Sequence, residues 1–173
     1  EKSLTNEKVK YCYQKKKESI PTGTCIILIT PDSERTMCTF LGIAGKISDR
    51  DIDENAVKNS ELIFLEGYLW DEGDPKTAFN KAINISKKTA MTLSDKFCVD
   101  RHKKSFLDLV NNKLDITFAN ELEILSLIDT KSFDEVISFS KQIGKLVVIT
   151  RGDKGSLAIE KNEVIECDSQ KNL

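Results

Sequence analysis

The sequence predicts an α/β fold in which a largely parallel β-sheet is flanked by helices. Short β-rich apolar runs alternate with helical patterns of about 10–15 residues, which is typical of βαβ units with right-handed crossovers. The apolar runs lack polar alternation, as expected of parallel strands covered on both faces. With 173 residues, 39% of them apolar, the chain can form one domain with a core. We expect a hairpin segment at 21–45 and an α/β core at 46–173.

The first two strands are predicted to form a β-hairpin. Residues 24–30 and 36–41 are apolar runs of strand-forming residues. Between them, Pro31 and Asp32 stand where a turn favours them. Arg35 follows in the same turn, where it could reach over a ligand or face solvent. Residues 1–20 are polar and without a clear period, so no element is predicted there.

After the hairpin the sequence alternates between helix and strand patterns. Helices are predicted at residues 49–59, 101–111, 121–128 and 133–143, and over about a dozen residues from Pro75, a residue favoured at the first position of a helix. Strands are predicted at residues 62–65, 90–93, 116–118 and 145–150, followed by strand-like runs at 156–159 and 163–167. Ligands of such sheets bind beyond the carboxyl ends of the strands. The residues to inspect there are Glu66, Asp95, Asn120 and the segment after Thr150.

Composition excludes several classes of partner. The formal net charge of −2 argues against binding nucleic acid through a general basic field. The run Lys15-Lys16-Lys17 is interpreted as a solvated surface rather than a phosphate site. The first 20 residues lack the apolar core of a signal peptide, and no apolar run approaches the ~18 residues that cross a bilayer. We therefore expect neither a nucleic-acid nor a membrane partner.

The five cysteines are widely scattered and form no CxxC pair. This pattern predicts neither a disulfide framework nor a metal site, and it is typical of single thiols in a reducing cytoplasm. The only histidine, His102, lies in the charged run 100–104, which we interpret as a solvated face rather than a catalytic site.

Residues 150–155 read TRGDKG and directly follow the strongest strand pattern. Gly152 and Gly155 let the backbone turn closely, so the loop can present N–H groups to a phosphate, with Arg151 and Lys154 as positive charges. A plain turn between adjacent strands explains the same residues. Neither a Walker A loop nor a Rossmann fingerprint is present.

Two further candidates stand at strand ends. Asn120 and Glu123 match a capping box, with Asn as the N-cap and Glu three residues later. The same groups could contact phosphate-bound water or Mg²⁺, which prefers one or two carboxylates plus waters, and both interpretations can hold at once. Glu66, beside Gly67, could accept a hydrogen bond from a substrate hydroxyl or be an ordinary loop charge.

Taken in order, these segments resemble the ribokinase-like (PfkB) family of carbohydrate and nucleoside kinases. The resemblance covers residues 21–167 and rests on PTGT at 21–24, LEGYL at 65–69, NELE at 120–123 and TRGDKG at 150–155. It implies an ATP site that includes Asn120, Thr150, Arg151, Gly152 and Gly155. It also implies that Glu123 lies near Mg²⁺ and that Glu66 contacts the substrate. The hairpin with Arg35 is implied to contribute to a substrate lid and to contacts in a homodimer.

Two motifs of that family are absent. One is a Gly-rich substrate motif near the N-terminus. The other is Gly-Ala-Gly-Asp, which supplies donors for the developing phosphate charge and the Asp that takes the hydroxyl proton. We therefore expect an incomplete, internal fragment without a catalytic base, inactive by itself.

The parent protein is expected to be a kinase that uses ATP and Mg²⁺ on a small sugar. A nucleoside kinase and a non-catalytic α/β ligand-binding module are the alternatives. A receiver-like domain using Asp95 is disfavoured because no companion carboxylates cluster near the first strand.

Overall fold

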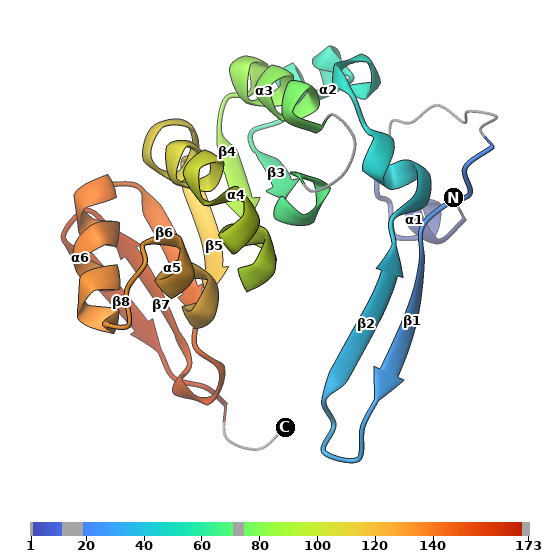
Figure 1. The fold of residues 1–173 in the computed structure, drawn as a ribbon. Helices are drawn as coiled ribbons and strands as arrows, with labels where there is room; N and C mark the ends of the chain where they lie inside the picture. Colours follow the sequence, from blue (N-terminus) through green and yellow to red (C-terminus); the bar gives the residue numbers. More distant parts are fainter. Residues whose placement is uncertain (1, 12–18, 71–74, 171–173) are drawn as a thin grey trace.

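The computed structural model describes residues 2–11, 19–70 and 75–170, so Cys12 and the lysine run 15–17 lie outside the described residues. The described strands form a two-stranded sheet and a six-stranded sheet in the order β3-β4-β5-β6-β7-β8 (Figure 1). The strands are β1 Thr24–Ile29, β2 Arg35–Phe40, β3 Ile63–Glu66, β4 Thr89–Thr92, β5 Ile116–Asn120, β6 Leu146–Thr150, β7 Ser156–Glu160 and β8 Glu163–Cys167. The helices are α1 Lys2–Asn6, α2 Glu54–Asn59, α3 Pro75–Ile85, α4 Lys96–Asp108, α5 Glu121–Leu127 and α6 Phe133–Ile143.

The large sheet joins a parallel part to an antiparallel part. Strands β3 to β6 are parallel neighbours, whereas β7 pairs antiparallel with β6 and β8 antiparallel with β7. The predicted α/β fold with a largely parallel sheet is confirmed. Because the four parallel strands run the same way, their carboxyl ends meet at one edge.

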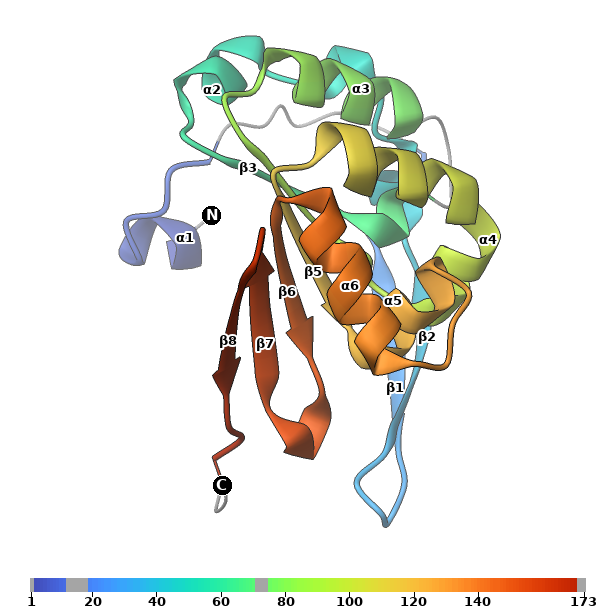
Figure 2. The ribbon, with the colours of Figure 1, turned by 90° about the vertical axis from the view of Figure 1, so that its left-hand side faces the viewer.

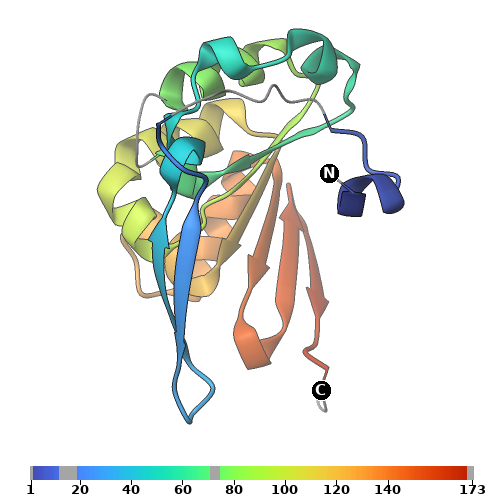
Figure 3. The same ribbon diagram turned by 90° about the vertical axis from the view of Figure 1, so that its right-hand side faces the viewer.

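Helices α4, α5 and α6 lie together on one face of this sheet (Figure 2). Strands β3 to β6 follow one another in sequence order, and right-handed crossovers between such strands all fall on the same face. From the opposite side, strands β6 to β8 lie in front of the helices (Figure 3). The prediction that both faces are covered is therefore wrong for the described residues.

Burial along the strands agrees with this arrangement. The neighbours Thr117, Val147 and Ile159 share the helix side and are buried. On the other side, Phe64 and Ile165 are 58% and 65% exposed. The core consequently lies between the helices and one sheet face, where Trp70 packs edge-on against the Phe79 and Phe106 rings, with centroids 5.1 and 6.1 Å apart.

Two predicted helices have different boundaries in the structure. The predicted helix 49–59 is divided into a 3-10 turn, Asp49–Asp51, and α2, because the Asp53 side chain accepts the Ala56 N–H (3.0 Å) and caps a new helix there. Helix α4 begins five residues before the predicted start at 101, because Asp95 caps it. The charged run 100–104 therefore lies within α4.

The hairpin of β1 and β2 forms a sheet of its own, and all twelve of its strand residues are exposed. It extends past the carboxyl ends of the parallel strands, with its turn at the same end of the molecule (Figures 1 and 2). Within the described residues, no helix has both the length and the apolar character to cross a membrane.

Candidate functional site

The carboxyl edge of the parallel strands brings together polar residues from separate parts of the chain. Glu66 ends β3, Asn120 ends β5 and Thr150 ends β6. Adjacent strands are in register at this edge: Glu66 pairs with Thr92, and Asn120 pairs with Thr150. The segments that follow these strands form the candidate site.

Glu66 is held by the segment that follows β4. Its Oε1 accepts a hydrogen bond from the Ser94 hydroxyl, which in turn accepts the Tyr68 N–H (3.2 Å). A Cβ at Gly67 would come within 2.8 Å of the Leu93 carbonyl oxygen and 2.9 Å of Ser94 Oγ. Glycine therefore permits the close approach that fixes the Glu66 carboxylate beside the end of β4.

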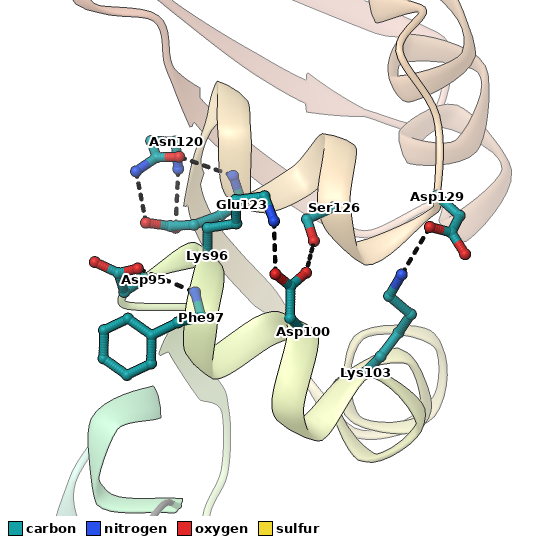
Figure 4. A network of polar contacts seen from close by, with 9 residues as sticks. All are labelled: Asp95, Lys96, Phe97, Asp100, Lys103, Asn120, Glu123, Ser126 and Asp129. Atoms are coloured by element: carbon teal, nitrogen blue, oxygen red, sulfur yellow. Dashed lines mark hydrogen bonds and ion pairs between the residues drawn. The ribbon is translucent and has the colours of Figure 1, made fainter.

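Asn120 and Glu123 form a complete capping box at the start of α5 (Figure 4). The Glu123 N–H donates to Asn120 Oδ1 (2.8 Å), and the Asn120 N–H donates to Glu123 Oε2 (3.0 Å). Asn120 Nδ2 also donates to Glu123 Oε1 (2.6 Å). Both carboxylate oxygens are thus oriented by Asn120, which fixes the side chain at the junction of β5 and α5.

Glu123 places a carboxyl group where solvent barely reaches, since the residue is only 4% exposed. Burial is the main reason that its pKa is raised, and the nearby Asp95 and Glu66 carboxylates raise it further against the opposing bonds from Asn120. Among the described residues, no lysine or arginine forms an ion pair with these three carboxylates. Within the described residues, these three carboxylates therefore concentrate negative charge without an ion pair, since the loop cations Arg151 and Lys154 pair with Glu121 instead.

An aromatic pair borders the same carboxylates. The rings of Tyr68 and Phe97 lie with centroids 5.9 Å apart and are partly exposed. Burial, with the neighbouring Asp95 carboxylate, raises the pKa of the Tyr68 phenol to about 12, so the hydroxyl stays protonated near neutral pH. It donates to Asp95 Oδ2 over 3.4 Å, while Asp95 Oδ1 accepts the Phe97 N–H (3.0 Å).

The loop 150–155 closes tightly between β6 and β7. The Arg151 N–H donates to the Gly155 carbonyl (2.8 Å), and the Gly155 N–H donates to the Gly152 carbonyl (3.0 Å). Gly152 and Gly155 both have positive φ angles, +58° and +82°, which glycine adopts without steric cost. The Arg151 side chain pairs with Glu121 and stacks on Phe133.

The chain matches the family model described as pfkB family carbohydrate kinase over residues 1–172. It belongs to the pfkB family of carbohydrate kinases. Among solved structures it is similar to adenosine kinase from Sinorhizobium meliloti, with 32% identity, a TM-score of 0.93 and coverage of 99% of this chain and 54% of that one. It is equally similar to a probable sugar kinase from Rhizobium etli, with 31% identity, a TM-score of 0.92 and coverage of 98% and 53%.

A more distant structure shares the fold of this pfkB-family chain. It is a candidate ribokinase II from E. coli in complex with ATP and Mg²⁺, with 22% identity, a TM-score of 0.73 and coverage of 87% of this chain and 51% of that one. The chain thus spans about half the length of these solved relatives. No curated protein matches it.

Most residues predicted from the pfkB resemblance lie along this one edge. They are Glu66, Asn120, Glu123, Thr150, Arg151, Gly152 and Gly155. Arg35 differs, because it is the exposed first residue of β2 in the separate hairpin. Their roles toward a nucleotide or substrate stay predictions.

The sequence patterns missed Ser94, the Tyr68–Phe97 pair and Glu121. A carboxylate at a strand end signals a candidate site by itself, but a serine 28 positions later gives no sign that it will bond to Glu66. The Tyr68–Phe97 pair depends on the packing of the 3-10 turn Gly67–Trp70 against the start of α4. Glu121 was visible as part of NELE, yet its partner Arg151 comes 30 residues later along the chain.

Proposed function

We propose that this chain is part of an ATP-dependent kinase that transfers the γ-phosphate to a hydroxyl group of a small sugar. One observation carries the proposal: Glu66, Glu123 and the loop 150–155 converge on one sheet edge of a pfkB-family chain. Phosphoryl transfer depends chiefly on positioning and charge stabilisation, and this edge holds its polar groups in fixed orientations.

The nucleotide is proposed to bind along β5, β6 and the loop between β6 and β7. Gly152 would present its backbone N–H and Thr150 its hydroxyl to phosphate oxygens, because glycine lets an anion approach the backbone closely. Gly155, whose N–H donates to the Gly152 carbonyl, would shape the turn that holds them. Arg151 belongs to the same loop, and Asn120 borders it across the β5–β6 pair. Bound Mg-ATP would supply the transferable phosphoryl group and part of its charge neutralisation.

Glu123 is proposed as the carboxylate nearest Mg²⁺. Among the described residues, no three Asp, Glu, His or Cys side chains form a metal cage. Mg²⁺ commonly uses one or two carboxylates together with waters and substrate phosphates, so a single carboxylate is compatible with it. The unbalanced charge of Glu66, Asp95 and Glu123 also favours a cation at this edge. The E. coli relative in complex with ATP and Mg²⁺ supports the same pair of cofactors.

Glu66 is proposed to accept a hydrogen bond from a hydroxyl of the sugar, in place of the bond from Ser94. Arg35 would approach the substrate from the hairpin, with segment 21–45 acting as a lid over the core 46–173. No residue of this chain is proposed as the base that takes the proton of the attacking hydroxyl. The exposed hairpin is also proposed to form the contact of a homodimer, and the free cysteines suit a reducing cytoplasm.

A nucleoside acceptor is the second candidate. The partly exposed Tyr68–Phe97 pair beside Glu66 and Asp95 offers an aromatic surface on which a base could stack. The similarity to an adenosine kinase, at 32% identity, supports the same candidate. Sugar and nucleoside share the hydroxyl that Glu66 would bind, so the ring contacts distinguish them.

The experiment that tests the function is ADP release by the full-length protein with Mg-ATP against ribose, fructose, adenosine and inosine. We expect turnover with one acceptor well above the others. If adenosine is preferred, Phe97→Ala should raise its KM at least tenfold. Absence of turnover with every acceptor, together with absence of ATP binding, would contradict the proposal and favour a non-catalytic module.

A further inference from the structure

We infer that Arg151 is a positioning residue that fastens the loop 150–155 to the first residues of α5 and α6, rather than a residue that contacts the nucleotide phosphates. The inference rests on the proposed function, since the loop is the proposed phosphate site. It differs from the role expected from the sequence, in which Arg151 and Lys154 supply charge to the phosphate.

The Arg151 side chain is engaged on two sides within the protein. Its Nε lies 3.5 Å from Glu121 Oε2, and its guanidinium carbon lies 3.8 Å from the centroid of the Phe133 ring. A planar guanidinium stacks well on an aromatic face. The Arg151 and Glu121 side chains are only 21% and 24% exposed, so water screens this ion pair less than one at the surface.

These contacts join three elements at the candidate site. Glu121 is the first residue of α5 and Phe133 the first residue of α6, while Arg151 follows β6 directly. Glu121 also lies two residues before Glu123, on the same first turn of α5. The Arg151 contacts therefore couple the loop to the helix that carries the proposed Mg²⁺ carboxylate.

The backbone of the loop depends on the same residue. The Arg151 N–H donates to the Gly155 carbonyl (2.8 Å), and the Arg151 carbonyl accepts the Lys154 N–H (3.1 Å). Fixing Arg151 consequently orients both ends of the turn that contains Gly152. Without its side chain, the loop would keep these bonds but lose its attachment to the helices.

Both cationic side chains of the loop, Arg151 and Lys154, form ion pairs with Glu121. Lys154 Nζ lies 3.7 Å from the Glu121 oxygen that faces Arg151. Two positive side chains therefore neutralise one carboxylate that would otherwise repel a nucleotide. Phosphate recognition is left to the two loop N–H groups that these internal bonds do not use, those of Gly152 and Asp153, which Arg151 holds in place.

Five variants of the full-length protein test this inference: Arg151→Ala, Arg151→Lys, Phe133→Leu, the double variant of Arg151→Ala with Phe133→Leu, and Phe139→Leu as a control on α6 away from the loop. The readouts are the KM for ATP, the KM for the acceptor and the thermal unfolding midpoint. We expect Arg151→Ala to raise the KM for ATP about 10- to 100-fold, the scale of a loop misplaced by about 1 Å, with the acceptor KM within about twofold of wild type.

The decisive variant is Phe133→Leu, because the Phe133 ring stacks on Arg151 and would touch the nucleotide only through it. We expect Phe133→Leu to raise the KM for ATP severalfold. Arg151→Lys should raise this KM less than Arg151→Ala does, but should not restore the wild-type value. In the double variant, the increase in KM should be smaller than the product of the increases in the two single variants. Phe139→Leu should lower the unfolding midpoint without changing the KM for ATP. If Arg151→Ala does not fold, Arg151→Lys and Phe133→Leu carry the test.

A direct phosphate contact gives a different pattern. Phe133→Leu would then leave the KM for ATP unchanged and Arg151→Lys would be close to wild type, and either result overturns the inference. An active wild type with an unaffected Arg151→Ala variant overturns it as well, while leaving the proposed function intact. Failure of the wild type to bind ATP overturns the proposed function and this inference together.

Discussion

Glu123 has two effects of opposite sign on the stability of the folded protein. Its carboxylate completes the capping box of α5 through Asn120, which favours the fold by about 1 kcal/mol. Its burial beside Asp95 and Glu66 nevertheless raises its pKa, so the ionised form is disfavoured in the folded protein. A buried charge kept at such a cost is typical of a functional site.

Glu123→Gln in the full-length protein separates the two roles. Because the folded-state pKa of Glu123 lies above its unfolded value, this group stabilises the fold when protonated and loses that contribution as the pH rises through the folded pKa. At pH 7 without nucleotide we expect the Gln variant to unfold at a higher temperature than wild type. The difference should shrink as the pH falls toward 4.5, the ordinary pKa of the group.

The same variant should bind Mg-ATP about 10- to 100-fold more weakly, the range seen when a group that supports a metal is lost. Glu166→Gln, which removes an exposed charge on β8, serves as the control and should change neither property. A Gln variant that is less stable at pH 7 and binds Mg-ATP as well as wild type would refute this assignment of Glu123.

Individual site residues differ in how far the sequence could predict them. Asn120 and Glu123 are recognisable because a capping box is local, with both partners within three positions. Glu66 is recognisable as a carboxylate at the end of an apolar run. Its bond to Ser94 is not, because that contact depends on the parallel pairing of β3 with β4.

At the scale of an element, the loop 150–155 contains two glycines with different surroundings. A Cβ at Gly155 would lie 2.1 Å from the Cys167 carbonyl oxygen, whereas one at Gly152 would meet no heavy atom within 4 Å outside its neighbours. Both have positive φ, but only Gly155 also has no room for a side chain.

We expect Gly152→Ala to cost about 1–2 kcal/mol of unfolding free energy, from the left-handed backbone alone. It should also raise the KM for ATP about tenfold, because a methyl group would hold phosphates away from the backbone. Gly155→Ala should cost more than about 3 kcal/mol, because the backbone of the turn must shift. Urea unfolding and ATP titration measure both quantities. Equal stability losses, or an unchanged KM for Gly152→Ala, would contradict this explanation.

The hairpin exposes apolar side chains on both of its faces. Ile26 and Ile27 are adjacent in β1, point to opposite faces and are 68% and 49% exposed. One face of the hairpin would lie over the substrate as a lid, and the opposite face would contact a second copy of the chain. An isolated two-stranded hairpin is marginal in water, so both contacts would also stabilise it.

Ile26→Glu and Ile27→Glu form a matched pair for this element. We expect one of them to convert the full-length protein from dimer to monomer, measured by light scattering after size-exclusion chromatography. The other should leave the dimer intact and raise the KM for the acceptor severalfold. If neither substitution changes the molecular mass, the hairpin is not the dimer contact.

Element prediction succeeded where the signals were local and failed where a cap decided the boundary. The hairpin and α6 lie close to where the apolar pattern predicts them. Helix α4 starts earlier, because the Asp95 cap lies outside its apolar periodicity. The same kind of cap, Asp53, divides the predicted helix 49–59.

For the whole molecule, the alternation of strand and helix patterns predicts the α/β class. The same alternation does not predict that the helices cover only one face of the sheet. Apolar runs such as β5 and β6 predict burial on both sides. Only the strand order β3-β4-β5-β6 reveals that successive crossovers share a face. Strand order depends on contacts distant in sequence, which no window of residues contains.

Mg-ATP is proposed to bind at the carboxyl edge formed by β5, α5 and the loop 150–155. A crystal structure of the full-length protein with Mg²⁺ and a non-hydrolysable ATP analogue would show where the nucleotide binds. We expect the phosphates on the backbone N–H groups of Gly152 and Asp153, Mg²⁺ on the side of Glu123, and Arg151 still stacked on Phe133. Nucleotide bound elsewhere on the protein, or no nucleotide at saturating concentration, would contradict this binding site.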